Sequence, residues 1–140
     1  MFDFDCAIVG TGPAGAAAAV AARAGLRVVL FESRALPRVK PCGGAMPAAA
    51  IALFTDFGRD IEPNIRRRIF QYRNLFEYEL PQDSGELTTP VLMVDHPSFD
   101  LAGVEYASGC GAVDVRDNTT VRNIAESPTD VILTTDTGER

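Results

Sequence analysis

The stretch Asp5-Cys6-Ala7-Ile8-Val9-Gly10-Thr11-Gly12-Pro13-Ala14-Gly15 decides the fold of this 140-residue chain. Residues 4–9 predict a parallel strand buried on both faces, which leads into a glycine-rich turn. An alanine-rich stretch up to Ala24 predicts a helix that Gly25 ends, and residues 26–31 predict a second strand that Glu32 follows. This order of strand, turn, helix, strand and acid is typical of one βαβ unit in a Rossmann-like sheet.

Each glycine of the turn has its own role in binding a dinucleotide. Gly10 permits the tight turn, Gly12 lets the backbone approach a pyrophosphate, and Gly15 lets the helix pack closely on the sheet. Pro13 suits the first turn of the helix, whose free N–H groups attract phosphate. Glu32 is placed to accept hydrogen bonds from ribose hydroxyls. A strand-to-helix turn without any ligand is the plain alternative.

Composition and charge exclude several classes of function. A net charge of −6 and an isoelectric point near 4.7 argue against a nucleic-acid surface, and Arg66-Arg67-Arg68 is expected to be a solvated strand or loop face. The three cysteines, Cys6, Cys42 and Cys110, are odd in number and lack metal-ligand spacing. They indicate a reducing compartment, with Cys6 a small core residue and no metal site.

Targeting and membrane-spanning patterns are not visible in the sequence. The apolar stretch 14–22 is far shorter than the ~20 residues that a membrane span requires. The acidic start, with Asp3 and Asp5, is unlike a signal peptide. We therefore expect a cytoplasmic protein.

Beyond the βαβ unit, the pattern predicts a loop, an antiparallel excursion and a second helix. Prolines and paired glycines predict a loop over residues 33–47, and an ordered loop beside a phosphate-binding turn is usually functional. Period-two alternation over 69–80 predicts a half-buried strand, or a hairpin turning near Arg73-Asn74, within a strand-rich excursion at about 62–95. The other expected elements are a short helix at 48–57, a turn at 81–85, a strand at 91–94, a helix from Pro97 to about Ser108, and strands at 113–115, 121–124 and 131–134.

Three stretches resemble flavoproteins, and two of them narrow the resemblance to one family. Gly12-Pro13-Ala14-Gly15 is similar to the fingerprint of flavoproteins with two dinucleotide-binding domains. Lys40-Pro41-Cys42-Gly43-Gly44 looks like a loop of the geranylgeranyl reductase family of FAD-dependent oxidoreductases, and Val94-Asp95-His96-Pro97-Ser98-Phe99-Asp100 is similar to a later segment of that family. The resemblance covers about residues 5–136 and implies an α/β, Rossmann-like FAD-binding fold with an antiparallel excursion.

The resemblance also implies how FAD, rather than its rival NAD, would be held. The cofactor would lie extended, from the glycine turn to a flavin site in the strand-rich region. The implied contacts are Gly10, Gly12, Pro13, Ala14 and Gly15 to the pyrophosphate, Glu32 to the ribose, Ser33 and the main chain of Val121 to the adenine side, and Cys42 and Gly43 toward the ribityl chain and flavin.

Two residues keep more than one interpretation. Cys42 is either a neighbour of the flavin or an ordinary loop thiol. His96 stands where the family usually has a cofactor-binding arginine, and its position suits a cofactor contact or a helix cap better than general-base catalysis. The sequence identifies no catalytic residue.

By resemblance, the function is reduction of carbon–carbon double bonds in an isoprenoid lipid, with an unidentified electron donor. The alternatives are an FAD-dependent monooxygenase or halogenase of the same superfamily, and a non-catalytic nucleotide-binding fragment. The family continues with further cofactor-binding segments after the position of Arg140, so we expect a truncated, N-terminal portion of a longer enzyme. Relatives that act on lipids often associate with membranes, which leaves peripheral association open here.

Overall fold

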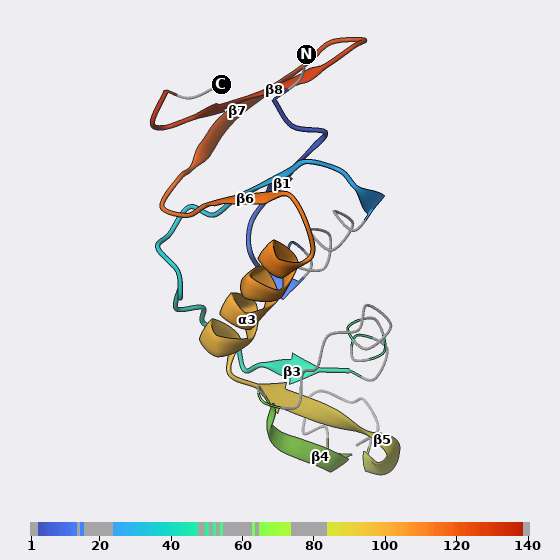
Figure 1. The fold of residues 1–140 in the computed structure, drawn as a ribbon. Coiled ribbons are helices and arrows are strands. Elements are labelled where there is room, and N and C mark those ends of the chain that lie inside the picture. Colours follow the sequence, from blue (N-terminus) through green and yellow to red (C-terminus); the bar gives the residue numbers. More distant parts are fainter. Residues whose placement is uncertain are drawn as a thin grey trace. The chain divides into compact units, whose positions relative to one another are not determined.

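The computed structural model has an α/β fold that divides into two units, which are described separately. The first unit comprises Met1–Lys40 and Pro97–Arg140, and the second comprises Pro41–His96. The structure describes residues 3–13, 15, 24–47, 50, 52, 54, 63, 65–73 and 84–138. Figure 1 shows the course of the chain through its helix and strands.

A parallel sheet forms the centre of the first unit. Its strands β1 (Cys6–Val9), β2 (Val28–Phe31) and β6 (Val113–Arg116) lie in the order β1-β2-β6. All four residues of β2 are buried, because the strand has a hydrogen-bonded neighbour on each side and both of its faces are covered. The parallel pairing of the two predicted strands is thus confirmed, while most of the helix predicted between them, residues 14 and 16–23, lies outside the described residues.

The first strand differs from the expectation of a strand buried on both faces. In β1, Cys6 and Ile8 are half-buried, whereas Ala7 and Val9 are exposed. The prediction was wrong because, of the β1 side chains, Ile8 packs on the core formed by the described residues, whereas Val9 on the opposite face is exposed. Cys6 is accordingly a half-buried thiol rather than a core residue.

One helix, α3 (His96–Gly109), covers the parallel sheet, and its residues 97–109 belong to the first unit. Val104 and Ala107 of this helix form a buried cluster with Leu30 of β2. Further apolar side chains pack around that cluster: Ile8, Leu36, Val113 and Val115. The helix predicted to open at Pro97 is confirmed, with its start one residue earlier.

The second unit contains an antiparallel sheet of β3 (Ala45–Met46), β4 (Ile65–Arg73) and β5 (Ser84–Val94) in the order β3-β5-β4. β4 pairs with β5 so that Arg73 lies opposite Ser84, which confirms the strand expected from residue 69 as far as Arg73. Residues 74–83, which include the alternative hairpin turn near Asn74, lie outside the described residues. The turn expected at 81–85 is wrong at its end, because Ser84 and Gly85 continue the strand opposite Arg73 and Tyr72.

Other expectations for the second unit are met where the chain is described. The three consecutive arginines of β4, 66–68, are exposed, as a solvated strand face requires. The predicted loop extends as far as Gly44, and β3 then interrupts it. Ala50, Ala52 and Phe54 are helical, while the rest of the helix expected at 48–57 lies outside the described residues.

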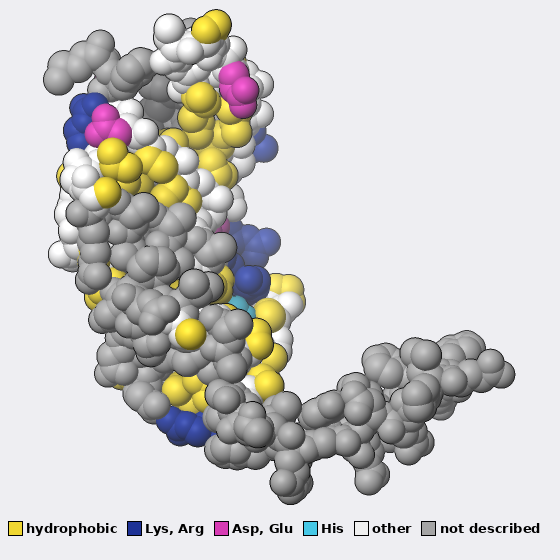
Figure 2. Space-filling model, turned by 90° about the vertical axis from the view of Figure 1, so that its right-hand side faces the viewer, with side chains coloured by type: hydrophobic (Ala, Val, Ile, Leu, Met, Phe, Trp, Pro, Cys, Tyr) yellow, Lys and Arg dark blue, Asp and Glu magenta, His cyan; other side chains and the backbone are white. Residues whose placement is uncertain are grey.

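A separate hairpin of β7 (Val121–Glu126) and β8 (Val131–Thr135) follows the parallel sheet and confirms the last two predicted strands. Three of its aliphatic side chains are about half exposed: Ile124, Val131 and Ile132. Figure 2 shows hydrophobic side chains on the surface at this end of the first unit. Among the described residues, no helix has the length and apolar character to cross a membrane.

Two adjacent glycines of the second unit are expected to respond differently to a methyl group. Gly44 has a φ of +81°, and a Cβ there would overlap the carbonyl oxygen of Val94, whose N–H donates to the Gly44 oxygen over 2.9 Å. Gly44→Ala should therefore lower the free energy of unfolding by about 1–3 kcal/mol in chemical denaturation. A Cβ on Gly43 meets nothing within 4 Å, so Gly43→Ala should change it by less than about 0.5 kcal/mol. Equal losses in the two variants would contradict this geometry.

Candidate dinucleotide-binding site

The glycine turn follows β1 at the carboxyl end of the parallel sheet. Gly10 has a φ of +101°, which a side chain rarely adopts, and its N–H donates to the carbonyl oxygen of Phe31 over 2.7 Å. Any Cβ on Gly15 would overlap the carbonyl oxygen of Gly10, so the start of the helix can lie against the turn only with glycine there. Two of the three fingerprint glycines are thus required by the backbone itself.

Glu32 follows β2 at the same edge of the sheet and binds back to the turn. One carboxylate oxygen, Oε2, accepts the N–H of Thr11 over 3.1 Å and its hydroxyl over 2.7 Å. The other, Oε1, accepts the Ser33 hydroxyl and the Arg34 N–H, both over 3.2 Å. With only 5% of its surface exposed, Glu32 joins the glycine turn to the loop after β2.

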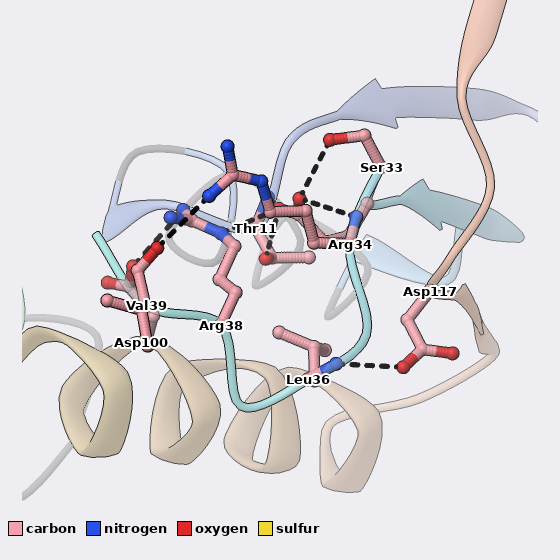
Figure 3. A network of polar contacts seen from close by, with 9 residues as sticks. Thr11, Ser33, Arg34, Leu36, Arg38, Val39, Asp100 and Asp117 are labelled. Atoms are coloured by element: carbon pink, nitrogen blue, oxygen red, sulfur yellow. Dashed lines mark hydrogen bonds and ion pairs between the residues drawn. The ribbon is translucent and has the colours of Figure 1, made fainter. Parts of the chain in front are cut away.

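Arg38 adds a positive charge to this cluster. Its Nε lies 2.8 Å from Oε2 of Glu32, and its Nη2 lies 3.2 Å from Oδ2 of Asp100 in α3. Arg38 belongs to the loop after β2. Figure 3 shows its guanidinium group directed toward Asp100 of α3. The Arg38 side chain is 13% exposed and that of Asp100 is 1% exposed, so these charges interact where water screens them weakly.

The surroundings of Glu32 keep it ionised. Burial would raise the pKa of its carboxyl group, but hydrogen bonds from Thr11 and Arg34 and the charge of Arg38 lower this pKa to about 2. Glu32 therefore presents a negative charge and hydrogen-bond acceptors at neutral pH. Such a group can bind hydroxyls, and it disfavours a phosphate at the same point.

Most of the residues predicted to contact the pyrophosphate and adenine lie in the first unit. Pro13 lies in the first helical turn, as its missing N–H allows, and Ser33 is exposed next to Glu32. Val121 begins β7, two residues after Thr119, whose N–H donates to the Glu32 carbonyl oxygen over 2.8 Å. Ala14 lies outside the described residues.

The remaining predicted residues belong to the second unit. Cys42 is an exposed free thiol in the loop before β3, and Gly43 is exposed beside it. His96 is buried at the first position of α3. Their expected contacts with a flavin stay predictions.

Sequence reasoning missed three residues of the cluster: Thr11, Arg38 and Asp100. Thr11 stands between two fingerprint glycines, where the motif prescribes no residue type. Asp100 closes one of the stretches that resemble the family, and Arg38 precedes the other by two positions. The available signal was Asp100, an acid within the helix that covers the sheet. An acid buried there needs a positively charged or hydrogen-bonding partner.

Comparisons with known proteins show which sequences this chain is similar to. Geranylgeranyl diphosphate reductase from the chloroplast of Oryza sativa subsp. japonica is 36% identical over 110 residues, which are 76% of this chain and 23% of that protein. Menaquinone reductase of Mycobacterium tuberculosis H37Rv is 46% identical over 55 residues, 39% of this chain and 14% of that protein. No family model matches the chain.

The chain is related to the geranylgeranyl reductase family of FAD-dependent oxidoreductases. It spans less than a third of the length of the curated relatives described above. The family resemblance stated from the motifs is thereby confirmed.

Solved structures share the fold of the chain. A geranylgeranyl bacteriochlorophyll reductase-like protein from Thermoplasma acidophilum has a TM-score of 0.75 at 20% identity, covering 94% of this chain and 34% of its own. Halogenase PltM in complex with phloroglucinol and FAD has a TM-score of 0.76 at 18% identity, covering 96% of this chain and 32% of its own. At these identities the likeness shows the α/β, Rossmann-type fold alone.

The acid sensitivity of the fold should depend on Glu32. Its pKa of about 2 in the folded chain lies below the ordinary value of 4.5, so the ionised carboxylate stabilises the fold above about pH 5 and loses that effect as the pH falls toward 2. A difference of this size corresponds to a contribution on the order of 3 kcal/mol. Glu32→Gln should therefore flatten the dependence of the free energy of unfolding on pH in this range, as measured by denaturant titration.

Asp5→Asn provides the matched control. The Arg27 side chain, hydrogen-bonded to Asp5, lowers the pKa of that carboxyl to about 2, but this pair is exposed to solvent. High salt should screen the Asp5 contribution much more than that of Glu32. Identical acid profiles for the wild type and Glu32→Gln in high salt would contradict the assignment.

Proposed function

We propose that the chain forms the dinucleotide-binding part of an FAD-dependent oxidoreductase that reduces carbon–carbon double bonds of an isoprenoid lipid. The observation that carries this proposal is the buried, ionised Glu32 beside the glycine turn, at the carboxyl ends of β1 and β2. Dinucleotides bind α/β sheets at this edge, with the diphosphate on the turn and a ribose on the acid.

The hydrogen bonds of Glu32 suggest which of its oxygens would bind the ribose. Oε2 is held by Thr11 and by Arg38, with contacts as short as 2.7 and 2.8 Å. The two bonds to Oε1 are longer, at 3.2 Å, and one comes from the exposed Ser33. A ribose hydroxyl can therefore replace a partner of Oε1 while Oε2 continues to hold the turn.

The other cofactor contacts are proposed from the family resemblance. The backbone from Gly10 to Gly15, including Pro13 and Ala14, would hold the pyrophosphate, and Ser33 and Val121 would border the adenine. Cys42, Gly43 and His96 would serve the ribityl chain and the flavin. A bound flavin would supply the hydride chemistry, while these residues bind and orient it.

The names of the relatives support the choice of substrate. Two of the reductases are named for geranylgeranyl diphosphate and for menaquinone, which are both isoprenoid compounds. In the proposed reaction one carbon of a double bond receives a hydride and its neighbour receives a proton. The halogenase with the same fold makes an FAD-dependent halogenase or monooxygenase the second candidate. A non-catalytic nucleotide-binding module is the third.

Substitution of Gly12 should separate cofactor binding from folding. A Cβ there would lie 3.5 Å from Nη2 of Arg38, which is an ordinary contact, so Gly12→Ala should fold normally. The methyl group would nonetheless occupy the space that a pyrophosphate requires, and Gly12→Val would fill more of it. FAD affinity, measured by fluorescence titration, should fall at least about tenfold in Gly12→Ala and below detection in Gly12→Val, with thermal stability of Gly12→Ala retained.

Gly109→Ala is the control for this experiment, because a Cβ at this last residue of α3 meets nothing within 4 Å and Gly109 is not among the proposed cofactor contacts. Unchanged FAD affinity in both Gly12 variants would rule out the turn as the pyrophosphate site.

The reaction type can be tested by its need for oxygen. A protein containing this chain, reduced anaerobically with dithionite and mixed with geranylgeranyl diphosphate, should yield products with two added hydrogens for each double bond reduced, as measured by mass spectrometry. Product formation that requires oxygen and halide, with no anaerobic reduction, would favour the halogenase instead.

A further inference from the structure

Arg38 lies against the part of the turn over which the diphosphate would pass. Its Nη2 atom lies within 3.5 Å of the position that a Cβ on Gly12 would take. The absence of a side chain at Gly12 therefore leaves a space beside the turn that the guanidinium borders. An anion that enters this space to reach the backbone of the turn would also come within reach of Arg38.

The two carboxylates fix the guanidinium and still leave donors for a ligand. Glu32 binds Nε and Asp100 binds Nη2, over 2.8 and 3.2 Å. A guanidinium has five N–H donors; the Nε–H is hydrogen-bonded to Glu32 and the contact with Asp100 is an ion pair, so N–H groups remain for a ligand. Because it is held at both ends and is largely buried, Arg38 would lose little conformational freedom on donating to a phosphate oxygen.

The charges of the cluster lead to the same inference. Glu32 and Asp100 carry two negative charges beside a site for an anion, and Arg38 supplies the positive charge between them. Without Arg38, the diphosphate would approach two buried carboxylates in a region of low dielectric constant.

We propose that Arg38 is a direct ligand of the diphosphate of the bound dinucleotide, held in position by Glu32 and Asp100. This inference rests on the proposed function, since it needs a dinucleotide on the glycine turn. The Arg38 side chain would then contact both the diphosphate and Glu32, the acid that is proposed to bind the ribose. Arginine suits this role better than lysine, since its planar fork can bind a carboxylate and a phosphate at once.

The test compares ligands that differ only in phosphate. Adenosine and ADP are titrated into the ¹⁵N-labelled 140-residue chain, and amide shifts in NMR spectra give the affinities even where binding is weak. Arg38→Gln should weaken ADP binding roughly tenfold to a hundredfold, as expected for a lost charged hydrogen bond, and adenosine binding by less than about threefold. Arg38→Lys should recover part of the loss. Arg34→Gln, which removes a neighbouring exposed guanidinium bound to the Val39 carbonyl, should leave both affinities unchanged.

A double variant separates a direct contact from charge balance. Arg38→Gln with Asp100→Asn removes one positive and one negative charge, so the net charge of the cluster stays the same, and it avoids leaving two buried carboxylates that could prevent folding of the single variant. The proposal expects this variant to lose the preference for ADP over adenosine. Recovery of the wild-type preference would overturn it, as would equal loss of ADP and adenosine binding in Arg38→Gln. Failure of the wild-type chain to bind adenosine, ADP or FAD would instead overturn the nucleotide-binding function, and this proposal with it.

Discussion

The buried carboxylate of Glu32 connects the parts of the first unit that would otherwise be separate loops. It accepts the N–H and hydroxyl of Thr11 in the glycine turn, and it binds Arg38 in the loop after β2. Arg38 continues the connection to Asp100 in the helix that covers the sheet. A carboxylate so far from water is stable only because hydrogen-bond donors surround it. The shape of the turn and the charge of the site thus depend on the same group.

This arrangement links folding to recognition. The donors that keep Glu32 ionised include Thr11 of the turn, and Oε1, which accepts the hydroxyl of the exposed Ser33, is the oxygen proposed to accept a ligand hydroxyl. The turn contributes backbone N–H groups, which favour an anion, while Glu32 disfavours one at the ribose. A dinucleotide without a phosphate on that ribose matches this alternation of charge. The halogenase shares the fold, so the choice of reaction depends on the similarity of sequence to the reductases and not on the sheet.

Much of the first unit could be predicted from the sequence because its signals are local. The strand at Cys6–Val9, the turn, the strand ending before Glu32 and the helix from Pro97 all follow from apolar periodicity and from glycine and proline positions. The exposure of Val9 could not be predicted, since an apolar run does not tell which face of a strand will be covered. The pairing of Ser84 and Gly85 with β4 was missed because residues typical of turns are also tolerated in strands.

The candidate site was predictable only in part. Gly10, Gly15 and Glu32 stand at fixed spacings in a known motif, but the bridge from Arg38 to Asp100 joins residues far apart in the sequence and exists only once α3 packs on the sheet. No local pattern of residue types predicts an ion pair between residues so far apart in the sequence.

The most direct test of the account is a crystal structure of the chain with ADP bound. The proposed binding mode places the diphosphate against the backbone of Gly12 and a ribose hydroxyl on Oε1 of Glu32, with Thr11 still bound to Oε2. A structure with the ribose away from Glu32, or with the diphosphate bound elsewhere than at the glycine turn, would contradict it.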